Sequence, residues 1–234
     1  MKVALAAGLL LTVVGAAHGP TAALPDLDQA APQGLSVVER HGRLLLVFAS
    51  AVDNLGPGPL VVEGRRAGAI MRAWQIVGRR RYPLPTPLRY VRSETHQHWH
   101  LMDFERYELR RRDGSFLGRD HKSGFCLNDA YETRALNHAP LWTRECGRRR
   151  PRALVIREGI SPGFGDEYVP EKEGQSIDVT GLAPGRYLLV HRVNPSRTLV
   201  ERSYANNAAS VLIALHGRRV AVLARCPDSA SCGT

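Results

Sequence analysis

Short runs of apolar residues, separated by turn residues, recur along most of the chain. In several runs apolar and polar positions alternate, which is the pattern of a strand with one buried face. No long stretch after the N-terminal segment repeats with the 3.6-residue period of a helix. The runs that predict strands are Leu44–Phe48, Leu60–Val62, Ile70–Val77, His98–Leu109, Ala153–Ile156, Ser176–Val179, Tyr187–Val193, Ala209–Leu215 and Val220–Ala224.

This pattern predicts an all-β fold, an antiparallel β-sandwich formed by a single domain over residues 24–234. We expect residues 24–34 to be a flexible lead-in to the first strand. Two stretches, 119–150 and 157–174, have no strand pattern and are predicted to be irregular. Because long connections in a compact domain usually carry function, both are expected to contribute to a site.

Residues 1–23 have the features of a secretory signal peptide. Lys2 gives a positive start, and the apolar run Val3–Ala17 that follows it is too short to span a bilayer comfortably. Small residues come next, where cleavage is expected. The mature chain is therefore predicted to be secreted, with no transmembrane segment after cleavage. An uncleaved N-terminal membrane anchor is the alternative.

The cysteine count fits this export. An even number of cysteines in an oxidising compartment predicts two disulfides. Three pairings are possible, and proximity along the chain favours Cys126 with Cys146 and Cys226 with Cys232. A metal site built from these cysteines is disfavoured because no Cys-x-x-Cys spacing occurs.

The basic residues are almost all arginine. The formal charge is +10, and lysine occurs only at Lys2, Lys122 and Lys172, so arginine supplies 32 − 3 = 29 of the basic residues. This bias favours a bacterial chain encoded by GC-rich DNA. Three arginine runs are interpreted as solvated faces or as docking sites for an anionic cell-surface polymer, and secretion argues against a nucleic-acid partner. The runs are 79–81, 110–112 and 148–150.

Three histidines, His96, His98 and His100, alternate along a predicted strand. Alternate residues of a strand face the same side about 6–7 Å apart, so three imidazoles can converge on one ion. With nine histidines in 234 positions, a chance His-x-His-x-His is expected only about 0.01 times. Imidazole ligands suit copper, zinc, iron or nickel, and three of them leave coordination positions open for chemistry. The triad alone does not choose between a redox and a hydrolytic metal.

Further segments extend the pattern around the triad. Residues 96–104, HQHWHLMDF, resemble the copper-binding segment of the lysyl oxidase family. Residues 118–129, GRDHKSGFCLND, resemble the segment around that family's cofactor lysine. Residues 159–168, GISPGFGDEY, resemble the segment that ends in its cofactor tyrosine. Shorter matches continue in the same order, so the resemblance covers about residues 94–207.

The resemblance implies a secreted copper amine oxidase with lysine tyrosylquinone, a cofactor formed from one lysine and one tyrosine of the same chain. By this resemblance the three histidines would bind copper, while Lys122 and Tyr168 would form the quinone. The implied reaction converts a primary amine or peptidyl-lysine, with dioxygen, into an aldehyde, hydrogen peroxide and ammonia. Among the cysteines, Cys126 and Cys146 have an evident counterpart in the family, and Cys226 with Cys232 is a looser analogy.

Other points stay open at the level of sequence. The family's neighbouring cysteine and tryptophan near the tyrosine are replaced here by Phe164 and Gly165, and Thr95 stands where vertebrate members have a cysteine. A non-catalytic secreted copper-binding protein and an adhesive β-sandwich are the alternative functions. Proximity in sequence nominates four candidates for the general base. They are Asp103, His121, Asp166 and Glu167.

Overall fold

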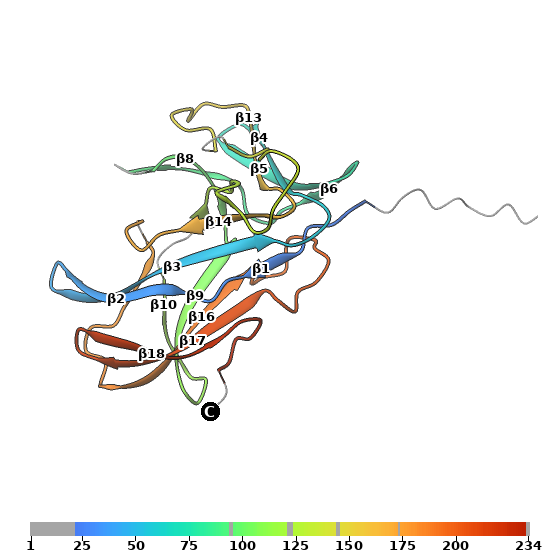
Figure 1. Cartoon of the computed structure of the whole chain (residues 1–234). Coiled ribbons are helices and arrows are strands. Elements are labelled where there is room, and N and C mark those ends of the chain that lie inside the picture. The colour runs from blue at the N-terminus through green and yellow to red at the C-terminus, as the bar shows by residue number, and fades with distance from the viewer. Residues whose placement is uncertain (1–21, 94–95, 121–123, 144–145, 173, 233–234) are drawn as a thin grey trace, which may run out of the picture.

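The computed structural model describes residues 22–93, 96–120, 124–143, 146–172 and 174–232 (Figure 1). These residues form strands, turns and loops but no helix, which confirms the predicted all-β class. Within them, therefore, no helix is long and apolar enough to cross a membrane. Most of the predicted signal peptide, residues 1–21, lies outside the described part of the chain.

The strands are numbered in chain order and are labelled in Figure 1 where there is room. They are β1 (Leu27–Gln29), β2 (Gln33–Arg40), β3 (Arg43–Asn54), β4 (Leu60–Ala67), β5 (Ile70–Val77), β6 (Arg80–Pro83), β7 (Arg89–Arg92), β8 (Gln97–Met102), β9 (Glu105–Arg111), β10 (Phe116–Arg119), β11 (Gly124–Phe125), β12 (Tyr131–Glu132), β13 (Val155–Ile160), β14 (Phe164–Tyr168), β15 (Ser176–Asp178), β16 (Gly185–Val193), β17 (Ala208–His216) and β18 (Arg219–Cys226).

The long strand β3 is the centre of a six-stranded antiparallel sheet. Its first half pairs with β2 and β15, and its second half pairs with β1 and β14. The short strand β12 pairs with β14. Phe48 and Val52 of β3 are completely buried, because alternate residues of a strand face the same side. This sheet fixes the position of β14, which ends in Tyr168.

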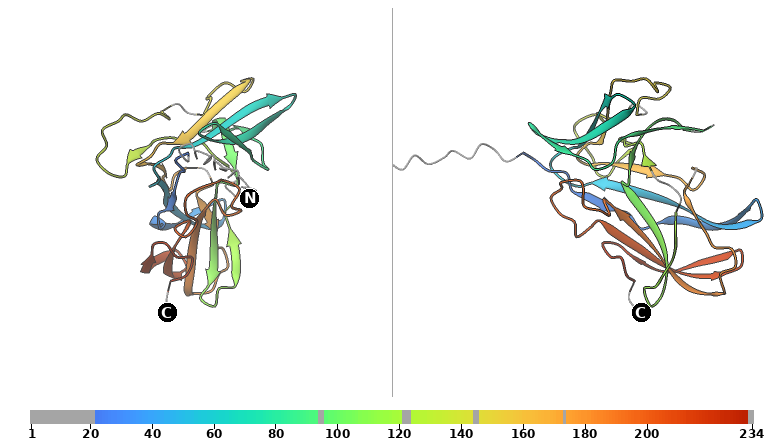
Figure 2. Two further views of the ribbon diagram at one scale, coloured as in Figure 1. Left: turned by 90° about the vertical axis from the view of Figure 1, so that its right-hand side faces the viewer. Right: turned by 180° about the vertical axis from the view of Figure 1, so that it is seen from behind.

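A second sheet packs against the first. It contains five strands in the order β10-β9-β16-β17-β18. The two sheets meet at Phe48 and Tyr107, whose ring centroids are 4.9 Å apart. The Tyr107 hydroxyl also lies 2.7 Å from Ser50 Oγ across the interface. The right-hand view of Figure 2 shows blue β3 above the red strands β17 and β18. Antiparallel sheets that share one core in this way form the predicted sandwich.

Two smaller sheets lie on the other side of β3, at the top of Figure 1. One has the order β13-β4-β5-β6, and the other has the order β11-β8-β7. A bridge between Met71 and Leu88 connects them. The three-stranded sheet carries the histidine triad, and its edge strand β11 leads toward the core beneath it.

The prediction of a flexible lead-in over residues 24–34 is wrong. Strand β1 lies in this stretch and pairs with β3 from Leu27 opposite Asn54 to Gln29 opposite Val52. Leu27 is completely buried, and its N–H donates to Glu201 Oε2 at 3.0 Å. A strand of three residues is too short to show alternation in the sequence. Its extended conformation is determined by pairing with β3 and not by its own pattern of apolar residues.

The prediction of an irregular segment over residues 157–174 is also wrong, since it contains most of β13 and all of β14. Glycines hide the strand pattern here. A Cβ atom at Gly159 would lie 2.1 Å from the Leu60 carbonyl oxygen, and one at Gly165 would lie 2.4 Å from the Tyr131 ring. These strands therefore need glycine for close packing. Described residues of the other stretch, 119–150, form mainly loop, as predicted.

The single strand predicted over His98–Leu109 is divided into β8 and β9. Asp103 lies between them with a φ of 56°, in the left-handed region of backbone space. Aspartate is one of the few residues other than glycine that adopts this conformation readily. The turn at Asp103 ends the strand that holds the triad and starts a strand in a different sheet.

The two disulfides are Cys126–Cys146 and Cys226–Cys232, which confirms the pairing that proximity favours. The first joins the residue after β11 to the loop that contacts β8, where the Cys146 carbonyl accepts a hydrogen bond from the Trp99 N–H at 2.9 Å. Its two cysteines are 20 positions apart in the chain, and such a link stabilises a fold by about 3 kcal/mol in the loop-entropy model. It ties the end of β11 to the loop that is hydrogen-bonded to β8 in the triad-bearing sheet.

A cluster of guanidinium groups surrounds Glu63 on β4. Its carboxylate lies 2.6 Å from Arg65 Nε, 2.7 Å from Arg81 Nη2 and 2.6 Å from Arg157 Nη2. Burial raises the pKa of Glu63, but the hydrogen bonds and charges of Arg65 and Arg157 outweigh it, so the pKa is lower than usual. The ionised form is therefore favoured by folding.

We expect the Glu63→Gln variant to lose about 1.5–3 kcal/mol of unfolding free energy at pH 7, the usual range for hydrogen bonds to charged groups. Because the folded pKa is depressed, this stability is present above the unfolded pKa of about 4.3 and is lost as the pH falls through the folded pKa. Urea unfolding at pH 7 and pH 3 measures the difference, which should shrink at pH 3. The exposed pair of Glu39 and Arg218 supplies the control, and Glu39→Gln should change stability by less than about 1 kcal/mol.

Candidate metal centre

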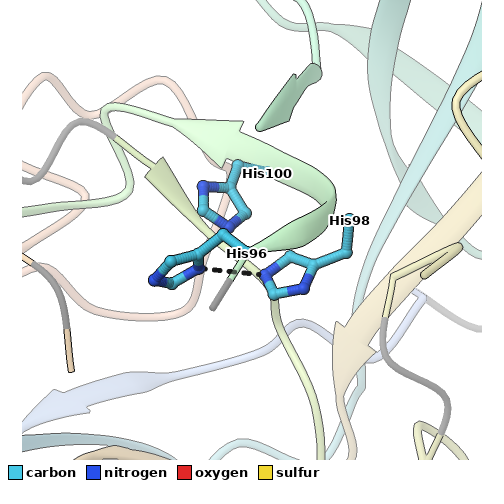
Figure 3. Close-up of side chains that lie close together, drawn as sticks. All are labelled: His96, His98 and His100. Carbon is cyan, nitrogen blue, oxygen red and sulfur yellow. Dashed lines mark hydrogen bonds between the residues drawn. The ribbon is translucent and has the colours of Figure 1, made fainter. Parts of the chain in front are cut away.

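The side chains of His96, His98 and His100 converge at the end of β8 (Figure 3). The ring centroids lie 4.7–5.3 Å apart, and His96 Nδ1 is 3.4 Å from His98 Nε2. One ring nitrogen of each residue lies within 4.8 Å of the others. Two nitrogens on one ion can be at most about 4.2 Å apart, given bonds of about 2.0–2.1 Å. Small ring rotations are thus sufficient to bind a metal, and the donor set fits copper or zinc.

Exposure differs among the three residues of this histidine triad. His100 is buried, with 6% of its surface exposed, while His96 and His98 are partly exposed. The triad therefore has one side anchored in the protein and one side reachable from solvent. A metal held by three imidazoles in this setting keeps coordination positions that small molecules can reach.

Trp99 braces β8 from the face opposite the triad. Its indole N–H donates to the Arg150 carbonyl at 3.0 Å, and its backbone N–H donates to the Cys146 carbonyl at 2.9 Å. Tyr90 of β7 meets the indole edge to face at 5.5 Å, and the Arg66 guanidinium lies 5.3 Å from the ring. Because successive strand residues point to opposite faces, fixing Trp99 also fixes the direction of its two histidine neighbours.

Gly124 of β11 lies directly against the triad. It is the cross-strand partner of Met102. A Cβ atom at this position would lie 2.7 Å from the Cβ of His100 and 3.1 Å from its Nδ1. Only glycine permits this approach without moving the His100 ring. The next residue, Phe125, pairs with Leu101 and points to the other face of the strand.

Tyr168, the last residue of β14, lies in the core next to β11. Its ring meets the Phe125 ring edge to face, with centroids 5.1 Å apart. Its hydroxyl oxygen is 2.7 Å from Asp166 Oδ2 and 3.0 Å from the Cys126 carbonyl oxygen. Burial, followed by the charges of Asp166 and Glu105, raises the pKa of Tyr168 well above that of free tyrosine. At neutral pH the side chain is therefore a protonated phenol.

Segment 124–126 thus connects the two predicted elements of the site. Gly124 contacts His100, Phe125 contacts the Tyr168 ring, and the Cys126 carbonyl faces the Tyr168 hydroxyl. A family model described as lysyl oxidase matches residues 72–226, which include all of these residues and the triad. The chain belongs to the lysyl oxidase family. The family model matches residues 72–226, so it extends at both ends beyond residues 94–207, which the resemblance in sequence covers.

Individual relatives are similar to part of the chain. Human lysyl oxidase homolog 3 is 28% identical over 179 residues, 76% of this chain and 20% of the relative. Human lysyl oxidase homolog 1 is 34% identical over 128 residues, 53% of this chain and 20% of the relative. Rat protein-lysine 6-oxidase is 37% identical over 117 residues, 48% of this chain and 25% of the relative. The chain matches a quarter or less of the length of these relatives.

The segment that resembles the lysyl oxidase cofactor lysine is only partly described. Lys122 and its neighbour His121 lie outside the described residues. Three of the four candidate bases can be placed. Asp103 and Glu167 are exposed, whereas Asp166 is completely buried, 2.7 Å from the Tyr168 hydroxyl oxygen. Of these three, Asp166 is the one with a contact to a predicted site residue.

Sequence reasoning missed two side chains that contact the tyrosine site. Asn128 donates to Asp166 Oδ1 at 3.0 Å and so holds the carboxylate that faces Tyr168. Lys172 places its Nζ 4.7 Å from the centroid of the Tyr168 ring. The rarity of lysine in this lysyl oxidase family member singles out Lys172, but no pattern in the sequence connects it with the tyrosine four positions earlier.

Proposed function

We propose that this chain is a secreted copper-dependent amine oxidase. It converts primary amines, peptidyl-lysine among them, into aldehydes. The reaction consumes dioxygen and water and releases hydrogen peroxide and ammonia. The observation that carries the proposal is the continuous set of contacts from the histidine triad through segment 124–126 to Tyr168. Family membership supports the same conclusion.

In this proposal His96, His98 and His100 bind copper, and Tyr168 and Lys122 form lysine tyrosylquinone. Copper supplies the capacity to oxidise the tyrosine ring, and the quinone supplies an electrophile that accepts electrons from the substrate amine. The exposed side of the triad admits dioxygen. Trp99, on the opposite face of the strand, keeps the histidine side chains in place.

Asp166 and Asn128 control the tyrosine proton. The Asp166 carboxylate lies 2.7 Å from the phenol oxygen, and Asn128 holds the other carboxylate oxygen at 3.0 Å. Oxidation of a phenol is easier once its proton leaves, and Asp166 is the base in direct contact with it. The raised pKa of Tyr168 means that this transfer is unfavourable until a nearby cation stabilises the phenolate.

The position of Lys122 in the chain is compatible with this role. Lys122 precedes Gly124 by two residues, and two residues of chain span at most about 7 Å. Gly124 contacts His100, and its neighbour Phe125 contacts Tyr168. Lys122 itself lies outside the described residues, and its part in the crosslink is what the family resemblance implies.

Charge bears on the substrate and on docking. After loss of Lys2 with the signal peptide the net charge would be 10 − 1 = +9, which opposes the approach of strongly basic substrates at long range. We propose amines in a neutral or acidic context as substrates, and an anionic cell-surface polymer as a docking partner. Arg81 binds Glu63 and Arg110 binds Glu108, so these two arginines of the runs are engaged within the protein.

Copper and dioxygen should both be required to form the carbonyl cofactor. We expect phenylhydrazine to label the full-length protein after it is loaded with copper and aged in air. Protein aged without copper, or with copper under nitrogen, should show less than a tenth of that label by absorbance and mass spectrometry. Equal labelling of all three samples would contradict the proposal.

A non-catalytic copper-binding protein is the second candidate function, and one observation favours it. Phe125, against which Tyr168 packs, points to the face of β11 opposite Gly124 and His100. A tyrosine that stays there would not reach the metal. This function predicts stoichiometric copper binding, an unmodified Tyr168 and no peroxide with any amine, all of which the same experiment measures.

A further inference from the structure

A short turn after β14 brings a lysine back over Tyr168. The Lys172 N–H donates to the Val169 carbonyl at 3.1 Å, and the Gln175 N–H donates to the Lys172 carbonyl at 3.1 Å. The Lys172 Nζ lies 4.7 Å from the Tyr168 ring centroid and 3.4 Å from the Glu167 carbonyl oxygen. The amine of an otherwise exposed side chain is thus held against the ring of a buried tyrosine.

The far end of this turn is anchored in the core. Gln175 is buried, and its side-chain amide donates to Ser50 Oγ at 2.7 Å. Ser50 is the cross-strand neighbour of Tyr168. Tyr168 before the turn and Gln175 after it are therefore both attached to Ser50 of β3, which limits how far the Lys172 amine can move from the ring. Fixed proximity of this kind raises the effective concentration of a nucleophile by orders of magnitude.

We propose that Lys172 is a second amine that can crosslink to the oxidised ring of Tyr168, in competition with Lys122. The inference rests on the proposed function, because the unmodified phenol does not react with amines. A cation over an aromatic ring can also be a purely electrostatic contact. The two roles differ in one respect, since only a nucleophile forms a covalent bond.

The crosslink balances with dioxygen as the oxidant. First, Tyr168 and one dioxygen give an ortho-quinone and water. The Lys172 nitrogen then forms a bond to a ring carbon, and the ring hydrogen and one amine proton move to the two quinone oxygens as the ring is reduced to a catechol. A second dioxygen takes two electrons and two protons from this catechol and leaves as hydrogen peroxide. Relative to the unmodified residues, the product has gained one oxygen atom and lost four hydrogen atoms.

The two possible crosslinks give different tryptic peptides. Tyr168 belongs to the peptide 158–172, which has no internal lysine or arginine. A crosslink to Lys172 blocks cleavage there and yields one linear peptide, 158–186, with the mass change given above. A crosslink to Lys122 instead joins the peptide 158–172 to the peptide 120–134 as a branched product. Fragmentation by mass spectrometry distinguishes these products from an ordinary missed cleavage, which carries no mass change.

The experiment compares the copper-loaded, air-aged full-length protein with Lys122→Arg and Lys172→Arg variants, which keep the positive charges. We expect the modified linear peptide 158–186 in Lys122→Arg and its complete loss in Lys172→Arg, which should keep the branched product. Oxidised Tyr168 without the linear peptide in Lys122→Arg would overturn the inference and leave the proposed function intact. Unoxidised Tyr168 in all three proteins would overturn both.

Discussion

The Tyr168→Phe variant should lose phenylhydrazine labelling and amine-dependent peroxide release completely, while it still binds copper through the three histidines. The substitution removes one hydroxyl and keeps the ring that packs against Phe125 at 5.1 Å. Without the hydroxyl the ring cannot become a quinone by either crosslink. The variant leaves Asp166 Oδ2 without its phenol partner, and such a loss costs about 1–3 kcal/mol. Copper titration and a peroxide assay on the folded variant measure both expectations.

Tyr131→Phe is the matched control for this substitution. Tyr131 is also a hydrogen-bonded phenol, since it donates to Asp53, and it pairs with β14 at Gly165. Burial and its bond to Asp53 raise its pKa as well. We expect this variant to keep both labelling and peroxide release. If labelling survived in Tyr168→Phe and disappeared in Tyr131→Phe, the cofactor would form on Tyr131, and our proposal would name the wrong tyrosine.

The triad could be predicted from sequence because its geometry is local. His98 and His100 alternate on β8 and face the same side whatever the rest of the fold does, and His96 directly precedes the strand. The structure brings their rings to within 5.3 Å of one another. The antiparallel sandwich was predictable for a different reason. The second half of β3 alternates between buried and partly exposed residues, while β16 and β17 are short continuous apolar runs bounded by turn residues, and both patterns are typical of strands.

The surroundings of Tyr168 could not be predicted in this way, because they depend on the register between distant strands. β14 pairs with β3 so that Tyr168 lies opposite Ser50, more than a hundred residues earlier in the chain. The glycines at 163 and 165 interrupt the apolar pattern that would have indicated a strand. Asn128 and Lys172 reach the site only once this register is set. No local rule connects them with the tyrosine.

A buried polar network next to the site shows the same limitation. His191 Nε2 lies 2.5 Å from Glu105 Oε2, which also accepts a hydrogen bond from the Tyr107 hydroxyl at 2.7 Å. All three residues come from the paired strands β9 and β16. Each looks like an ordinary alternating position in sequence, and only the pairing of the strands places them together. The charge of Glu105 helps to raise the pKa of Tyr168, so this network acts on the predicted cofactor residue.

Removal of one triad histidine should abolish tight copper binding and every reaction that depends on it. We expect His98→Ala to weaken copper binding more than about 100-fold, because the loss of outer-shell partners alone costs about 10–100-fold. We choose His98 and not His100 for this substitution because His98 is partly exposed, whereas His100 is buried against Gly124. Competition with a chromophoric chelator measures the affinity. Phenylhydrazine labelling and both crosslinked peptides should disappear with it.

The control replaces a histidine outside the triad. His216, at the end of β17, is exposed, and His216→Ala should keep copper affinity and labelling unchanged. Thermal unfolding provides a second readout that does not depend on the cofactor. Copper at about 100 times its dissociation constant stabilises a folded protein by about 2.7 kcal/mol, so the melting temperature of wild type and His216→Ala should rise with copper. If His98→Ala showed the same rise and the same chelator competition, copper would be bound elsewhere, and the triad would not be the metal centre.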